Sequence, residues 1–330
     1  MIRSLTSVRV KKLSDNREEG ASLRERKSGV AGETRQHISV MAKEAVAMLA
    51  PQKGEVVIDG TAGQGGHSEA LLKHADITLL SIDADDEAVA MTQLRLSRLG
   101  SRAKLATVAL GNFADIKSIA HAHHLKEANK ILLDLGWNMG QLSSGRGFSF
   151  LTDEPLNMSY GAKPASGFTA SEILNSWSEK AIADALFGYG EERFARRIAK
   201  AVAARREVAP IKTTLEFVEI INDSVPSFYR HGRLHPATRS FQALRIAVND
   251  ELGVLERFLK DSLELLAPEG RLAIITFHSI EDRLVKQTFA RWAKEKKAVL
   301  LTKKPITAAE SELAANRPSR SAKLRGIQKI

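Results

Sequence analysis

The chain has 330 residues, 43% of them hydrophobic, and a formal net charge of +10. This length favours a catalytic domain with a second module, and the positive charge favours a polyanionic partner over an ordinary basic surface. The absence of cysteine excludes disulfide bonds and thiolate zinc sites. No apolar run approaches the roughly 20 residues of a membrane helix, which predicts a soluble, cytoplasmic protein without a membrane partner.

Residues 1–36 mix basic and acidic side chains and lack the apolar core of a secretory signal. Met1–Leu13 is basic and contains serine, as the start of an organelle transit peptide would be, but acidic residues follow it. We predict a disordered N-terminal extension over 1–36, with a transit peptide as the alternative.

The next part of the chain, 37–137, alternates between helical and strand patterns. The predicted elements are a helix over Val40–Leu49, a strand over Val56–Ile58, a helix over Ser68–Lys73, a strand over Ile77–Ile82, a helix over Glu87–Leu99, and strands over Lys104–Leu110 and Lys130–Leu135. Short apolar strands that alternate with helices predict an α/β fold, with a parallel-rich sheet and helices on both faces. We assign 37–137 to the first part of a catalytic core.

The pattern then becomes helical, and we predict an inserted helical domain over 138–239. Its expected helices are Ala170–Phe187, Glu191–Arg206 and Thr214–Val225. A long helix over Phe241–Leu266, a turn at 268–270 and a strand over Arg271–Phe277 form the second part of the core, 240–300. The tail, 301–330, is basic and poor in large apolar residues, which predicts an extended or disordered segment.

The segment Val56–Ser68 combines a strand, a glycine cluster and a helix start. Glycines permit a tight turn that a ligand can approach, and the helix N-terminus offers unpaired amide donors. Asp83 ends the second strand twenty residues after Gly63, where its carboxylate can accept both ribose hydroxyls of a nucleoside. The spacing also fits a dinucleotide site or a turn without a ligand. We assign Asp59 to the turn.

Two later strand ends converge on the same edge of the sheet, beyond which ligands bind in open parallel sheets. Phe113 follows the third strand and either packs against an adenine or belongs to the core. Asp134 ends the fourth strand, and Trp137 lies shortly after it.

A series of short motifs runs in order from about residue 37 to the end of the chain. The motifs are His37–Val40, Asp59–Ser68, Asp83, Asp134–Gly136, Arg146–Phe150, Tyr189–Arg193, His235–Arg239, Phe241–Ile246, Asn249, Phe277–Arg283 and Ser319–Arg325. In these motifs the chain resembles the ribosomal RNA small-subunit methyltransferase H family, also called MraW. So many matches in one order are more specific than a lone glycine motif.

The resemblance implies a Rossmann-like methyltransferase core with an inserted helical domain. It implies S-adenosyl-L-methionine as the cofactor and N4-methylation of a cytidine in the decoding region of 16S rRNA. The implied partner is small-subunit rRNA or the small ribosomal subunit. The cofactor site that it implies consists of Gly65, Gly66, His67, Asp83, Phe113, Asp134 and Gln141. We predict no metal site, and we consider a homodimer.

The chain departs from the family pattern outside the cofactor site. Glu154-Pro-Leu-Asn-Met-Ser-Tyr-Gly161 stands where the family usually has Gly-Pro-Leu-Asp-Met-Arg-Met-Asp. Asn138-Met139 replaces a usual serine pair, and Asn316-Arg-Pro318 replaces a usual Asn-Pro-Arg. These changes fall on the segment that we expect to hold the target nucleotide.

A cytosine amine is a poor nucleophile because its lone pair is conjugated with the ring, so catalysis needs in-line placement and acceptors for the amine protons. Asp134 and Trp137 fit the roles of acceptor and stacking platform, unless Asp134 contacts only cofactor and Trp137 is core. His278 follows a strand near the pocket and either touches substrate or packs. Ser279 and Asp282 fit a capping box. The target base must be unpaired or turned out of its helix.

Cations cluster on one face of the helix predicted over Glu191–Arg206. They are Arg193, Arg196, Arg197 and Lys200, extended by Arg205 and Arg206. With the basic segment Arg317–Arg325 they favour phosphate contact over a merely solvated face. Three other functions remain as alternatives: an amine methyltransferase on DNA or another RNA, a non-catalytic RNA-binding relative, and a nicotinamide oxidoreductase.

Overall fold

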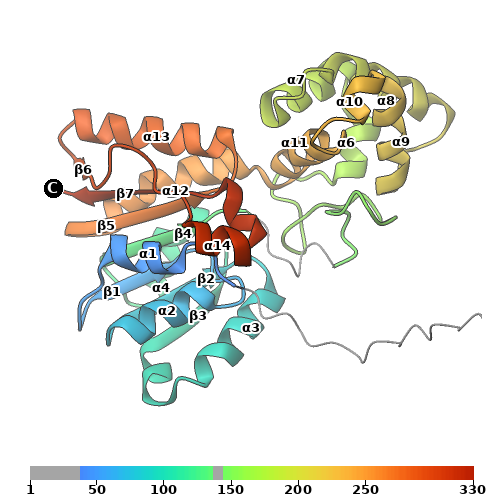
Figure 1. Ribbon diagram of the computed structural model, residues 1–330. Helices are drawn as coiled ribbons and strands as arrows, with labels where there is room; N and C mark the ends of the chain where they lie inside the picture. Colours follow the sequence, from blue (N-terminus) through green and yellow to red (C-terminus); the bar gives the residue numbers. More distant parts are fainter. Residues whose placement is uncertain (1–37, 137–143) are drawn as a thin grey trace, which may run out of the picture. The chain divides into compact units, whose positions relative to one another are not determined.

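The computed structural model describes residues 38–136 and 144–330 of the chain (Figure 1). The predicted N-terminal extension over 1–36 and its transit-peptide alternative lie outside the described residues, as do the predicted site residues Trp137 and Gln141.

The sheet has seven strands in the order β3-β2-β1-β4-β5-β7-β6. Their bounds are β1 Val56–Asp59, β2 Thr78–Asp83, β3 Ala106–Leu110, β4 Ala128–Asp134, β5 Leu266–Thr276, β6 Ala298–Leu300 and β7 Lys323–Lys329. Strands β1 to β5 pair in parallel, and β7 pairs antiparallel with β5 and β6. The predicted α/β class with a parallel-rich sheet is confirmed.

Helices cover both faces of the sheet (Figure 1). On one face pack α1 Ala42–Leu49, α2 Gly66–His74 and α3 Asp86–Ser97. On the other face pack α4 Ile116–Ala122, α12 Glu251–Leu265 and α13 Ser279–Lys294. Because the central strands are buried on both faces, they form continuous apolar runs, which is why the sequence predicted them well.

The inserted segment between β4 and β5 is helical and has a hydrophobic core of its own. Its helices are α6 Ala170–Ser176, α7 Glu179–Gly190, α8 Ala195–Val208, α9 Thr214–Ser224, α10 Ser227–Arg230 and α11 Thr238–Asn249. We call residues 144–249 the helical insertion. Phe241 and Leu244 of α11 belong to its core, so the insertion extends beyond the predicted boundary at residue 239.

Two predicted helices are each broken into two. The helix predicted over Ala170–Phe187 ends at Ser176, and a second helix starts at Glu179 because the Ser178 side chain caps it. The helix predicted over Phe241–Leu266 is interrupted at Asp250, which has a left-handed φ of 46°. A backbone change of this kind turns the chain from the insertion back to the sheet.

The prediction of an extended or disordered tail over 301–330 was wrong. This segment forms helix α14 Glu310–Ala315, a 3-10 turn over Arg317–Ser321 and strand β7. Leu324 and Ile327 are fully buried in β7, and its basic residue Arg325 pairs with the Asp282 carboxylate at 2.7 Å. Two apolar residues are enough here because β7 pairs with a strand on each side. None of the helices in the described ranges is long and apolar enough to cross a membrane.

Candidate functional site

A cavity of about 820 Å³ lies at the carboxyl ends of strands β1 to β5, under the start of α12 and the end of α11. Its volume is within the roughly 300–1,000 Å³ that is common for small-molecule sites. The strand ends contribute residues 60–64, 83–84, 110–113, 134–136, 277 and 278. The helical insertion and α12 contribute Tyr160, Gly161, Lys163, Ala165, Gln242, Arg245, Asn249, Glu251, Val254 and Leu255.

The glycine turn after β1 forms one wall of the cavity. Gly63 and Gly65 adopt left-handed φ values of 54° and 75°, which glycine tolerates without strain. Gly63 lines the cavity, whereas Gly65 and Gly66 pack behind it. A Cβ atom at Gly65 would lie 3.2 Å from Thr92, and one at Gly66 would overlap the Ser39 hydroxyl. Gly65 and Gly66 therefore shape the turn.

Two buried or half-buried carboxylates hold this turn in place. Asp59 accepts hydrogen bonds from the Thr61 amide and, at 2.6 Å, from the Ser68 hydroxyl, in agreement with its assignment to the turn. Asp83 accepts from the Gly63 amide at 2.7 Å and from the Asp85 amide at 3.0 Å. Burial raises the pKa of Asp83 to about 6, although both amides act in the opposite direction. Each Asp83 oxygen keeps a second lone pair for a ligand hydroxyl.

Asp134 and His67 lie together at the end of β4. The His67 ring atom Nε2 lies 2.9 Å from the carbonyl oxygen of Val40, so Nε2 carries the proton and donates it. The unprotonated Nδ1 lies 3.5 Å from Oδ2 of Asp134. Burial lowers the pKa of His67 to about 4, whereas burial and nearby carboxylates raise the pKa of Asp134. Among the described residues, Oδ1 of Asp134 is buried and has no hydrogen-bond partner.

Phe113 belongs to the core and also lines the cavity, so its packing against an adenine stays a prediction. Its ring packs edge-on against Phe258 of the core with centroids 5.6 Å apart, and the residue also lines the cavity. Next to it, Leu110, Val254 and Leu255 give this end of the cavity an apolar wall. Such a wall suits the flat face of a purine.

His278 caps the helix that follows β5. Its Nδ1 accepts from the Glu281 amide, and the Glu281 carboxylate accepts in return from the His278 amide at 3.4 Å. The capping box predicted for Ser279 and Asp282 is thus shifted by one residue, because an imidazole nitrogen replaces the usual hydroxyl. Since Nδ1 accepts, Nε2 carries the proton. Nε2 is buried and lies 2.9 Å from Oε1 of Glu281, without a hydrogen bond of good geometry in the described ranges.

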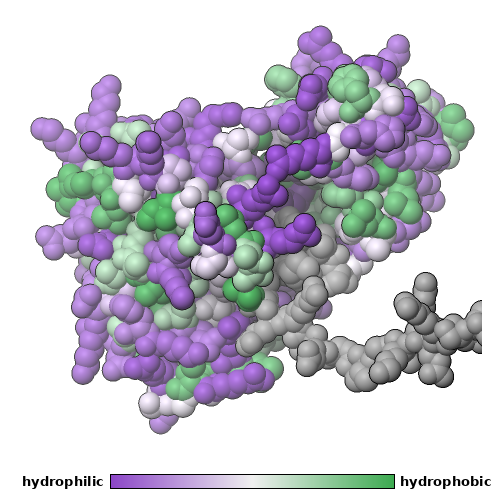
Figure 2. Space-filling model, in the orientation of Figure 1, coloured by the Kyte–Doolittle hydropathy of each residue, from purple (hydrophilic) through white to green (hydrophobic). Residues whose placement is uncertain are grey.

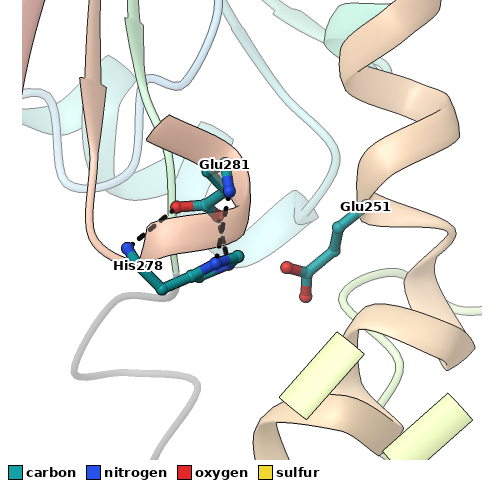
Figure 3. Close-up of side chains that lie close together, drawn as sticks. All are labelled: Glu251, His278 and Glu281. Carbon is teal, nitrogen blue, oxygen red and sulfur yellow. Dashed lines mark hydrogen bonds and ion pairs between the residues drawn. The ribbon is translucent and has the colours of Figure 1, made fainter. Parts of the chain in front are cut away.

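Glu251 lies beside this histidine, so that His278 and the carboxylates of Glu251 and Glu281 face one another (Figure 3). Arg245 binds Glu251 through two hydrogen bonds of 2.7 and 2.9 Å, and the Tyr160 hydroxyl donates to Glu251 at 2.9 Å. These donors occupy the Glu251 carboxylate, and the nearest imidazole nitrogen is protonated. The three side chains therefore form part of a hydrogen-bond network within the protein.

Residues 34–330 match the model of the MraW methylase family. The chain belongs to the MraW methylase family. It is similar to the ribosomal RNA small subunit methyltransferase H of Syntrophobacter fumaroxidans, with 42% identity over 90% of this chain and 98% of that protein. For the protein of the same name from Synechocystis, identity is 44% over 89% of this chain and 93% of the relative.

A crystal structure of an rRNA methylase from Streptococcus thermophilus aligns with a TM-score of 0.40 and 11% identity, over 88% of this chain and 93% of that one. The family resemblance found in the motifs is confirmed by the family match, and so is the assignment to the methyltransferases.

In this MraW methylase five of the predicted site residues line one cavity: His67, Asp83, Phe113, Asp134 and His278. Gly65 and Gly66 do not line it. The sequence reasoning gave no role to three further residues in the cavity, Tyr160, Arg245 and Glu251. The sequence did offer a signal for two of them. Tyr160 lies in the segment that departs from the family pattern, and Arg245 lies in a family motif.

Proposed function

We propose that this MraW methylase uses S-adenosyl-L-methionine to methylate the N4 amine of a cytidine in the decoding region of small-subunit rRNA. The names of its relatives support rRNA as the substrate class. The observation that carries the choice of an amine is that Oδ1 of Asp134, buried and without a hydrogen-bond partner among the described residues, lines one cavity with the His278 imidazole. The proposal retains the expected cytoplasmic location, and a homodimer remains a prediction.

The cavity fits the proposed cofactor. Asp83 offers free lone pairs to ribose hydroxyls, and the apolar wall around Phe113 suits the adenine. Oδ2 of Asp134 faces the unprotonated Nδ1 of His67 at 3.5 Å. A cationic amino group placed between these acceptors would satisfy them. Gln141 and Trp137, predicted for the cofactor and the target base, lie outside the described residues.

An acceptor on Asp134 and a donor on His278 would complement the amine edge of cytosine. That edge presents an N–H donor at N4 beside an acceptor at N3, whereas the corresponding edge of uracil has the reverse order. A carboxylate acceptor and an imidazole donor therefore select cytosine over uracil. Adenine presents the same donor and acceptor order, so adenosine must be included in the assay.

When bound, S-adenosyl-L-methionine would supply an activated methyl group, with a neutral thioether as the leaving group. As the N4 lone pair bonds to the methyl carbon, N4 becomes positive and must release a proton. Oδ1 of Asp134 accepts a hydrogen bond from the N4 amine and is placed to receive that proton. His278 holds the ring through N3, and its orientation is set by the cap with Glu281.

The test is mass spectrometry of nucleosides from unmethylated small subunits, free rRNA and DNA after incubation with the protein and cofactor. We expect N4-methylcytidine in rRNA, an at least hundredfold slower reaction for Asp134→Asn, and normal turnover for the exposed control Asp86→Asn. Methylation of DNA or adenosine alone would overturn the substrate assignment. Cofactor binding with no methylation of any substrate would favour a non-catalytic relative.

A further inference from the structure

We propose that one face of the helical insertion is a binding platform for single-stranded RNA, which stacks a base on Phe228 and pairs its phosphates with the surrounding arginines. We call this surface the basic-aromatic face, residues 193–200 and 227–233. The inference rests on the proposed function and extends it to a second RNA contact, away from the cavity.

The face carries cations without acidic partners. Six exposed side chains make no ion pair or hydrogen bond with any residue in the described ranges: Arg193, Arg196, Arg197, Lys200, Arg230 and Arg233. The neighbouring acids are already engaged. Glu191 binds Ser279 and Arg283 at the start of α13, and Glu192 is fully buried. Unpaired cations at this density favour a polyanion.

Aromatic rings lie among these cations. Phe228 on α10 has 67% of its surface exposed, and its ring packs edge-on against Phe194 at 6.3 Å. The Arg197 guanidinium lies 5.9 Å from the Phe194 ring centre, and Arg193 lies 5.6 Å from that of Tyr229. Planar guanidinium groups beside an exposed ring are the combination on which nucleic-acid bases stack. Figure 2 shows hydrophobic residues next to hydrophilic ones over the insertion.

A buried carboxylate, that of Glu192, links the two segments of the basic-aromatic face. The Glu192 carboxylate accepts from the Tyr229 hydroxyl at 2.6 Å and from the Phe194 amide at 2.8 Å, so it ties the start of α8 to α10. Burial and this carboxylate raise the pKa of Tyr229 to about 12, which keeps its hydroxyl a donor. A preformed surface loses little conformational entropy on binding.

The chemistry favours RNA strands over other partners. A duplex hides the faces of its bases, so an exposed ring gains from stacking only with an unpaired strand. A helix that binds a membrane surface needs an apolar face directed outward. The apolar side chains of α8, including Ile198, Ala199 and Val202, are instead buried in the core of the insertion.

Fluorescence anisotropy with the full chain and a labelled, unstructured RNA of about 12 nucleotides tests the proposal. We expect Phe228→Ala to weaken binding by about fivefold or more and Phe228→Trp to preserve it. The matched control is Leu94→Ala, since Leu94 is 60% exposed on α3 of the core. It should bind as the wild type does.

A second experiment tests the phosphate contacts by measuring how RNA affinity depends on salt concentration. Removing two of them with Arg196→Ala and Arg197→Ala should reduce the slope of log affinity against log salt by about 1.4. The control removes two exposed cations of the core, with Arg98→Ala and Lys104→Ala, and should leave the slope unchanged.

Three results would overturn the proposal: unchanged binding by Phe228→Ala together with an unchanged slope for the double variant, equal affinity for a hairpin of the same length, or displacement of the RNA by anionic lipid vesicles. The readout is binding and needs no methyl transfer. A wild-type chain that binds RNA through Phe228 but methylates nothing would contradict the proposed function alone.

Discussion

Asp83 should make nucleoside binding depend on pH. Its pKa is about 6 in the free protein, and we expect only the ionised carboxylate to accept both ribose hydroxyls. Because ionisation is lost as the pH falls through 6, affinity must fall with it. At about pH 5 roughly one tenth of the protein has Asp83 ionised, so binding should be about tenfold weaker than at about pH 8.

Calorimetry with methylthioadenosine is the appropriate assay, because this nucleoside keeps the ribose and adenine but lacks the amino-acid group that would contact Asp134. Asp83→Asn should bind more weakly at all pH values and lose the step near pH 6. The exposed control Asp86→Asn should keep the wild-type profile. An affinity that stays constant between about pH 5 and pH 8, or a step that survives in Asp83→Asn, would refute the role given to this carboxylate.

Three predictions concern stability and can be measured by urea unfolding. Gly190→Ala places a Cβ atom against a carbonyl oxygen of α11 and should lower the free energy of unfolding by about 1–3 kcal/mol. Its control is Gly188→Ala in the same helix, where the new Cβ atom meets no atom within 4 Å. This variant should raise the free energy of unfolding by about 0.5–1 kcal/mol. Ile327→Ala in β7 should cost about 2–5 kcal/mol, because the side chain is fully buried; a disordered tail would show no change. Asp282→Asn should cost about 1–3 kcal/mol at neutral pH by breaking the pair with Arg325. Burial acts to raise the pKa of Asp282, but the bond to Arg325 brings it below its ordinary 3.8, so this cost should disappear as the pH falls below that value.

The cofactor side of the site could be predicted because its residues follow from local patterns. Asp83 and Asp134 end apolar strands, and the carboxyl ends of parallel strands meet at one edge. The glycine cluster marks the turn beside them. Gly63 lines the cavity, whereas Gly65 and Gly66 lie behind it, so the cofactor contact expected for these two residues stays a prediction.

The substrate side could not be predicted in the same way. Tyr160 and Glu251 are 91 residues apart in sequence and meet only because the helical insertion folds back onto the core. No periodicity or spacing in one segment encodes such a contact. The predicted cap was one residue away from His278 because imidazole is an unusual capping group. Strand β7 was not predicted because basic residues alternate with its two buried apolar side chains.

The order of the strands has a consequence for how the chain folds. Strands β4 and β5 are neighbours in the sheet, yet residues 135–265 separate them in the sequence. Parallel pairing across so long a connection is slow, because the entropy of closing the loop is lost before the contacts form. The helical insertion has a hydrophobic core formed by its own residues, from Phe148 to Val248. Early folding of the helical insertion shortens the effective loop. We therefore expect it to bring strands β4 and β5 together.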